Sequence, residues 1–141
     1  MNIPQKYIAI GILTIGVVGF LMAYQGAPAA QDASNEQVLS TVSVENFSRL
    51  ISDSEVVLLD IRTSEEYSSG YIEGAKNLDF YAADFKTKLA TLDRETSYAI
   101  YCRSGNRTGQ ALKIMRELGF TSVADLAGGV GAWQAAGTQL K

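Results

Sequence analysis

Two short, continuous apolar runs are the sequence feature that most restricts the fold of this chain. Residues 55–61 read EVVLLDI and residues 98–102 read YAIYC. Runs of this length, bounded by polar residues, are typical of strands that are buried on both faces of a sheet. A third strand is predicted over residues 122–126, SVADL. A sheet buried in this way needs helices on both faces, and the segments between the runs must supply them.

Those segments have the spacing of amphipathic helices. Ser43 can cap a helix with an apolar face at Val44, Phe47 and Leu50. Thr63 and Glu66 have the spacing of a capping box, which predicts a short helix that ends at Gly70. Helical spacing recurs over residues 80–92, 108–118 and 130–136. Strands alternating with helices predict crossover connections, and therefore an α/β fold with a mostly parallel central sheet flanked by helices.

The N-terminal segment differs from the rest of the chain. Residues 7–24, YIAIGILTIGVVGFLMAY, carry no charge. As a helix of about 1.5 Å per residue they would span roughly 27 Å, close to one hydrocarbon core. Lys6 precedes the span, and Asp32 and Glu36 follow it. The positive-inside rule then places the remainder of the chain outside the cytoplasm.

Three interpretations of this segment stay open. A transmembrane anchor over residues 1–24 is favoured, because the apolar stretch exceeds the usual core of a signal peptide. Ala27 and Ala29 offer an Ala-x-Ala processing site, so a cleaved signal peptide competes with the anchor. The third interpretation is a helix buried in the core of a soluble protein. The first two predict a location in the cell envelope, membrane-anchored or, after cleavage near Ala29, periplasmic or secreted. Residues 25–37 then form a flexible linker, and residues 38–141 form the folded domain.

Composition excludes several kinds of chemistry. The 141 residues include one cysteine and no histidine, and the net charge is −3. Without histidine there can be no Ser-His-Asp or Cys-His catalysis and no His-ligated metal. A single cysteine excludes an internal disulfide and a cysteine-rich metal cage. The acidic balance argues against nucleic acid as a partner. We therefore expect neither a metal nor a resident cofactor.

The single cysteine lies where a nucleophile would be useful. Cys102 ends a predicted strand, and residues 102–109 read CRSGNRTG before the next helix. Ligands of open α/β sheets bind beyond the carboxyl ends of strands. Here Arg103, Ser104, Gly105, Asn106 and Arg107 can curl so that their N–H groups face one anion. Such a loop, with its arginines, lowers the pKa of a thiol and so supplies a thiolate without a base. An inert strand-end cysteine is the alternative.

These motifs closely resemble the rhodanese domain. The resemblance rests on CRSGNRTG, on VVLLDIRTSEEYSSGYIEGAKNL upstream and on LAGGVGAW downstream, and it covers about residues 38–139. It implies a three-layer α/β fold and a sulfurtransferase that forms a persulfide on Cys102, with the amides of residues 103–107 holding it. The implied substrates are a small anionic donor, such as thiosulfate or polysulfide, and a cyanide, thiol or protein acceptor.

The resemblance also implies supporting residues. Asp60 and Arg62 match the family's strand-end pair. Asp60 would brace the loop amides or Arg107, or else only cap the strand, and Arg62 is expected to pair with Glu66 at the surface. The turn at Gly74, Ala75 and Asn77, and the later Gly128, Gly129 and Trp133, would be architectural.

Two positions depart from the family pattern. Tyr71 replaces the usual histidine, which leaves the local hydrogen bonding open, and Thr108 replaces the common serine while keeping a hydroxyl close to the sulfur.

Two other functions compete with sulfur transfer. A cysteine-dependent phosphatase or arsenate reductase has a longer loop, with five residues between cysteine and arginine, whereas four separate Cys102 from Arg107. A non-catalytic, membrane-tethered rhodanese-like module that binds a partner protein is the main alternative. Inactive members commonly lack the cysteine, which this chain keeps in an intact loop.

Overall fold

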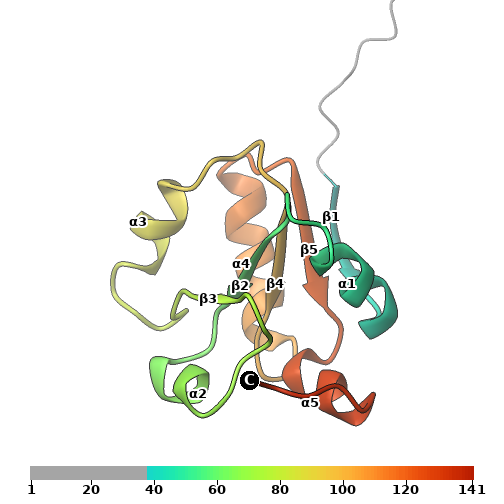
Figure 1. Ribbon diagram of the computed structural model, residues 1–141. Coiled ribbons are helices and arrows are strands. Elements are labelled where there is room, and N and C mark those ends of the chain that lie inside the picture. Colours follow the sequence, from blue (N-terminus) through green and yellow to red (C-terminus); the bar gives the residue numbers. More distant parts are fainter. Residues whose placement is uncertain (1–37) are drawn as a thin grey trace, which may run out of the picture. The chain divides into compact units, whose positions relative to one another are not determined.

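A computed structural model describes residues 38–141 as an α/β domain (Figure 1). Its five strands are β1 (Val38–Val42), β2 (Val57–Asp60), β3 (Lys76–Asn77), β4 (Tyr98–Tyr101) and β5 (Ser122–Leu126). Its five helices are α1 (Val44–Ile51), α2 (Ser64–Ser68), α3 (Phe85–Ala90), α4 (Asn106–Glu117) and α5 (Gly129–Ala135). The strand order is β1-β5-β4-β2-β3, and every pairing within this domain is parallel. The predicted α/β fold with a parallel central sheet is confirmed.

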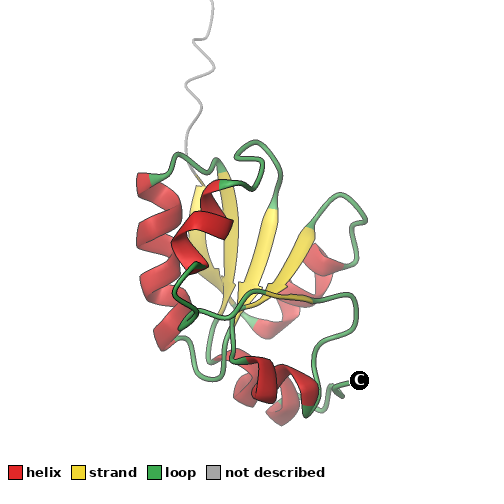
Figure 2. Cartoon of the chain, turned by 90° about the vertical axis from the view of Figure 1, so that its left-hand side faces the viewer, coloured by secondary structure: helices red, strands yellow, loops and turns green. Residues whose placement is uncertain are grey.

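The sheet lies between two helical layers, which Figures 1 and 2 show from two sides. On one face, α3 and α4 pack on the sheet around Leu89, Met115 and Ile100. On the other face, α1 and α5 contribute Phe47 and Trp133 to a second core cluster. All four residues of β4 are buried, because this strand lies in the middle of the sheet and both of its faces are covered.

Local sequence signals determine where several helices begin. Ser43 caps α1 by accepting a hydrogen bond from the N–H of Asn46, as its position predicts. The capping box is also present: Thr63 accepts from the N–H of Glu66, and a Glu66 oxygen accepts from the N–H of Thr63. The short helix α2 is thereby held at the carboxyl end of β2.

The sequence pattern does not predict two of the strands, and its bounds for two helices are wrong. β1 is an edge strand with a mostly exposed sequence, VLSTV, so it lacks an apolar run. β3 has only two residues. Over residues 80–92 only Phe85–Ala90 are helical, because residues 80–84 form turns whose aromatic side chains also occur at helical spacing. α4 begins at Asn106 instead of Thr108, directly after Gly105 with φ +98°.

The expected anchor or signal peptide at residues 1–24 and the linker at residues 25–37 lie outside the described residues. Within residues 38–141, no helix has the length and apolar character needed to cross a bilayer.

Candidate active site

The loop after β4 wraps around the sulfur of Cys102. The N–H of Gly105 donates a hydrogen bond to Sγ at 3.1 Å, and the Thr108 hydroxyl lies 3.7 Å from Sγ. Gly105 has φ +98°, in the left-handed region that glycine tolerates best, and this conformation turns the chain back toward the sulfur. Cys102 itself is only 1% exposed. The loop thus places one amide donor, that of Gly105, on the sulfur directly before α4.

Burial and hydrogen bonding shift the pKa of the Cys102 thiol in opposite directions. Burial alone would raise its pKa. Hydrogen bonding from the N–H groups of Thr108, Ser104 and Gly105, together with the Thr108 hydroxyl, outweighs burial and lowers the pKa below its ordinary value. The thiolate is thus stabilised mainly by backbone amides, which need no histidine.

Arg107 lies in the loop but uses its guanidinium on another partner. Its two terminal nitrogens bind the two carboxylate oxygens of Glu66 at 2.6 and 2.8 Å, across 41 positions of sequence. The Arg107 hydrogen bonds are the main cause that lowers the pKa of Glu66 to about 2. The ring of Tyr81, whose exposure is 69%, lies 5.5 Å from the Arg107 guanidinium carbon. Because Glu66 compensates its charge, Arg107 contributes less to the thiolate than the amides do.

The other loop residues differ in exposure. Arg103, Ser104 and Asn106 are exposed, Gly105 is half-buried, and Thr108 is fully buried. Arg103 forms no ion pair with any residue of the described domain, so its cation is available to solutes. Of the two loop arginines, Arg107 is thus engaged by Glu66, and Arg103 is the exposed one.

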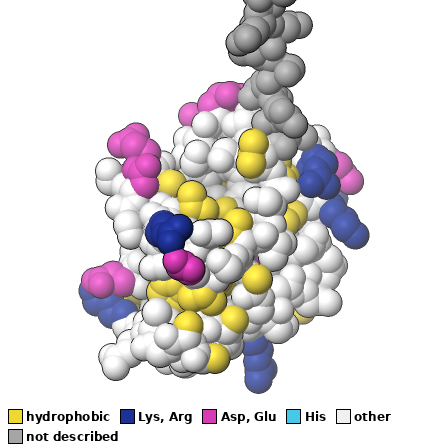
Figure 3. Space-filling model, turned by 90° about the vertical axis from the view of Figure 1, so that its right-hand side faces the viewer, with side chains coloured by type: hydrophobic (Ala, Val, Ile, Leu, Met, Phe, Trp, Pro, Cys, Tyr) yellow, Lys and Arg dark blue, Asp and Glu magenta, His cyan; other side chains and the backbone are white. Residues whose placement is uncertain are grey.

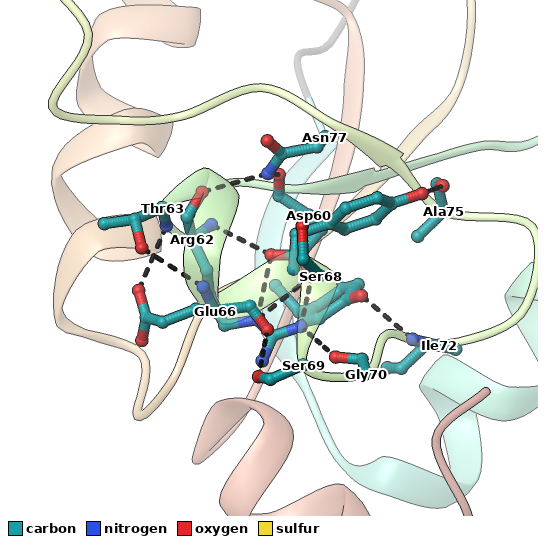
Figure 4. Close-up of polar contacts among 12 residues, drawn as sticks. Asp60, Arg62, Thr63, Glu66, Ser68, Ser69, Gly70, Ile72, Ala75 and Asn77 are labelled. Atoms are coloured by element: carbon teal, nitrogen blue, oxygen red, sulfur yellow. Dashed lines mark hydrogen bonds and ion pairs between the residues drawn. The ribbon is translucent and has the colours of Figure 1, made fainter.

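Asp60 and Arg62 form a buried pair beside the loop (Figure 4). Nη2 of Arg62 donates to Oδ2 of Asp60 at 2.6 Å and to the carbonyl of Gly70 at 2.7 Å. Asn77 donates to the carbonyl oxygens of both residues, at 3.0 and 2.9 Å. Together these bonds fix the segment that carries α2, and they thereby position Glu66 opposite Arg107.

Two expectations for this pair are corrected. Arg62 does not pair with Glu66 at the surface, and Asp60 braces neither the loop amides nor Arg107. Residues two apart on an extended chain project to the same side, so Asp60 and Arg62 bind each other. Tyr71, in place of the family's histidine, stacks on Tyr67 with ring centroids 4.4 Å apart.

Two consecutive glycines allow the start of α5 to approach the loop closely. A Cβ on Gly129 would lie 2.4 Å from the Cys102 carbonyl oxygen, and Gly129 has φ +58°. The N–H of Val130 donates to that same carbonyl at 2.9 Å. Trp133 is buried against Phe47, so its role is packing, as expected. The glycines let α5 support the backbone of the catalytic loop.

Reasoning from the sequence does not identify three residues that the structure places around the Cys102 loop or behind it: Glu66, Tyr81 and Asp125. The sequence identifies Glu66 only as a capping residue, and its second role depends on a contact distant in sequence. Tyr81 has no motif to indicate it. The sequence places Asp125, which is 3% exposed, only as part of a strand. The signal available is a carboxylate between Ala124 and Leu126 of that strand.

Two surface cavities of the described domain lie away from this loop. One of about 290 Å³ is lined by Ser64, Asn77, Leu78, Asp79, Ala82 and Lys88. Another, of about 540 Å³, lies between α1 and the end of α5, on the side of the molecule where Figure 3 shows apolar side chains between a few charged groups. None of residues 102–108 lines either cavity. The described residues also contain no group of three or more acidic, cysteine or histidine side chains arranged to hold a metal.

A thiol held by a loop amide at the end of a central parallel strand is the arrangement of an α/β enzyme that uses a cysteine nucleophile. Comparison with known families makes the assignment specific, since the profile of the Rhodanese-like domain matches residues 43–136. The chain belongs to this family.

Its relatives include sulfurtransferases. The chain is 35% identical over 86 residues to the putative sulfurtransferase YtwF of Bacillus subtilis, covering 61% of this chain and 81% of that protein. It is 30% identical over 70 residues to the thiosulfate sulfurtransferase PspE of Escherichia coli, covering 50% and 67%. A rhodanese-related protein of Thermoplasma volcanium superposes with a TM-score of 0.63 at 25% identity, over 72% and 96% of the two chains. The protein is a sulfurtransferase of the rhodanese type.

Proposed function

We propose that Cys102 carries a sulfane sulfur as a persulfide between a small anionic donor and a nucleophilic acceptor. The observation that carries this proposal is the 3.1 Å hydrogen bond from the Gly105 N–H to Sγ, within a loop that lowers the pKa of the thiol. In the first step the thiolate attacks the outer sulfur of thiosulfate. A new S–S bond forms on Cys102, and sulfite leaves with the electron pair of the broken bond.

The second step regenerates the enzyme. Cyanide or a thiolate attacks the outer sulfur of the persulfide, and the bond between the two sulfurs breaks. Thiocyanate or a new persulfide is released, and the Cys102 thiolate takes back the electron pair. Amides that stabilise this thiolate make it a good leaving group as well as a nucleophile.

Burial and charge favour a donor with a small terminal sulfur. Cys102 is only 1% exposed, which favours thiosulfate or polysulfide over a bulky disulfide. The exposed cation of Arg103 suits an oxyanion. The name of the E. coli relative, a thiosulfate sulfurtransferase, also supports thiosulfate as donor.

Mass spectrometry of the intact protein tests the proposal. After incubation with thiosulfate, the wild-type chain should gain the mass of one sulfur atom, and a reductant should remove it. The Cys102→Ser variant is the control and should gain nothing. A folded wild-type protein that gains no sulfur, or a variant that gains it equally, would refute the proposed carrier.

We also propose that the domain acts in the cell envelope, held there by residues 7–24 as a membrane anchor. The support is the uncharged composition of that span and the lysine that precedes it. Cleavage near Ala29 would instead release the domain on the same side of the membrane.

A further inference from the structure

Asp125 is a buried carboxylate close to the active-site hydroxyl. It lies on β5 and is directly paired with Ile100 of β4, two residues before Cys102. Its side chain lies on the same face of the sheet as that of Val123, the face covered by α4. Only 3% of Asp125 is exposed. The group is therefore held inside the protein behind the catalytic loop.

The two carboxylate oxygens of Asp125 are unequally satisfied. Oδ2 accepts a hydrogen bond from the Thr41 hydroxyl at 3.2 Å. Oδ1 is buried and has no hydrogen-bond partner among the described residues. A buried polar atom without a partner is costly and rare, and a catalytic role is one of the physical reasons for which a protein retains one.

A candidate for that partner is the Thr108 hydroxyl. It donates to the Gly105 carbonyl at 3.0 Å and lies 3.7 Å from the Cys102 sulfur. Thr108 belongs to the first turn of α4, the helix that covers the face of the sheet on which Asp125 lies. Burial raises the pKa of Asp125, whereas the Thr108 and Thr41 hydroxyls lower it. One hydroxyl proton thus has three acceptors within reach.

We propose that Asp125 is a positioning residue that controls, through the Thr108 hydroxyl, how strongly the Cys102 sulfur is stabilised as a thiolate. When Asp125 is ionised, its carboxylate attracts the Thr108 proton and adds a negative charge behind the sulfur. When Asp125 is protonated, the hydroxyl is free to donate to Sγ. Cys102 should therefore be a weaker acid while Asp125 is charged.

Other charged groups do not offer an equivalent route. β1 and α5 contain no titratable side chain, and Glu45 and Arg49 of α1 pair with each other at the surface. On α4, Arg107 is bound to Glu66. In β4, the hydroxyl of Tyr101 accepts a hydrogen bond from the N–H of Ile72. Within the described domain, Thr41 is the side chain that donates a hydrogen bond to Asp125, and Thr108 is the other hydroxyl that lowers its pKa.

The inference rests on Cys102 being the reactive thiol of the proposed function, and it is tested without sulfur transfer. The rate of alkylation by iodoacetamide is measured against pH. For the wild type we expect two coupled ionisations, one from Asp125 and one from Cys102. In the Asp125→Asn variant, only the ionisation of Cys102 should remain, and its pKa should be lower than in the wild type. At a pH between the two, that variant should react roughly two- to tenfold faster.

Two further variants test whether the effect of Asp125 reaches Cys102 through the Thr108 hydroxyl. Thr41→Val removes a donor from the carboxylate while leaving Thr108 untouched, so the first ionisation should move to higher pH. In a Thr108→Val background, the substitution Asp125→Asn should have a smaller effect than in the wild type. An equal effect in both backgrounds would overturn transmission through the hydroxyl.

Superimposable profiles for folded wild type and Asp125→Asn would overturn the proposal. If Asp125→Asn does not fold, Thr41→Val decides, since an unshifted profile would have the same meaning. A protein that alkylates as expected but never gains a persulfide would refute the proposed function while leaving the coupling intact.

Discussion

The carboxylate of Glu66 binds both terminal nitrogens of Arg107, so α2 is joined to the catalytic loop by a charged pair. The side chain of Arg107 is 10% exposed and that of Glu66 is 28% exposed, which makes the pair more than a surface contact. Asp60 and Arg62 hold the segment from which Glu66 projects. The position of Arg107 thus depends on residues that never approach the sulfur.

Replacing Glu66 by Gln should lower the stability of the domain at neutral pH and make that stability less dependent on pH in acid. The pKa of Glu66 is depressed from 4.5 to about 2, mainly by hydrogen bonds from Arg107. A depressed carboxyl pKa stabilises the fold above its unfolded value, and that stability is lost as pH falls through the folded value. We expect the wild type to lose about 1–3 kcal/mol between pH 4.5 and 2 from this group, and Glu66→Gln to lose it already at neutral pH.

Urea unfolding at several pH values measures this effect. Gln can still serve the capping box with Thr63, so the variant isolates the charge. Glu45→Gln, which breaks an exposed pair with Arg49, is the matched control and should change stability by less than about 0.5 kcal/mol. Equal effects of the two substitutions would contradict the special position of Glu66.

Replacing Thr108 should change the pKa of the Cys102 thiol more than replacing Arg107. Thr108→Val removes a hydroxyl that lowers the pKa of the thiol, and should raise that pKa. Arg107→Gln should raise it by a smaller amount, because Glu66 compensates the charge. It should impair the use of thiosulfate only slightly more than that of an uncharged donor, because both terminal nitrogens of Arg107 are already bound to Glu66. Alkylation against pH and turnover with both donors measure the two effects. Lys113→Gln, on the exposed side of α4, is the control.

The outcome of this comparison decides which group contributes most to lowering the pKa of Cys102. A larger shift from Arg107→Gln than from Thr108→Val would mean that the guanidinium dominates. No shift from Arg107→Gln in a folded protein would make Arg107 a structural brace.

Sequence reasoning places Cys102 at the end of a strand, in a loop before a helix, because the relevant signals are local. Cys102 follows an apolar strand and precedes a glycine and a helix, and these features alone indicate a strand-end cradle. The partners of Arg107 and Asp125 come from distant segments, Glu66 and Thr41, and no local periodicity encodes such contacts. β1 escapes prediction for a related reason: as an edge strand it is exposed and is defined by its pairing with β5.

The location of the domain can be tested directly. If residues 7–24 direct export, protease added to spheroplasts should degrade the domain while a cytoplasmic marker survives. Ile15→Arg introduces a charge in the middle of the span, at a cost of about 2.5–3.5 kcal/mol for insertion, and should leave the domain protected. The mass of the extracted protein distinguishes a retained anchor from cleavage near Ala29. A wild-type domain that stays protected would refute export.

Gly129→Ala should damage both stability and reactivity, because the loop leaves no room for a side chain there. The new Cβ would lie 2.4 Å from the Cys102 carbonyl oxygen and 2.7 Å from the Arg103 carbonyl oxygen, and backbone cannot move aside as a flexible side chain would. A left-handed alanine alone costs roughly 1–2 kcal/mol. The clash should bring the total to about 3 kcal/mol or more and displace the amides around the sulfur.

Gly74→Ala separates the two causes, since Gly74 also has a positive φ, +84°, but a Cβ added there would meet no atom within 4 Å. It should show only the conformational cost, with an unchanged rate of Cys102 alkylation. Thermal unfolding and alkylation kinetics of both variants provide the comparison. If Gly129→Ala costs no more than Gly74→Ala and leaves the thiol equally reactive, α5 does not support the catalytic loop by close approach, and the glycine pair serves only the turn before the helix.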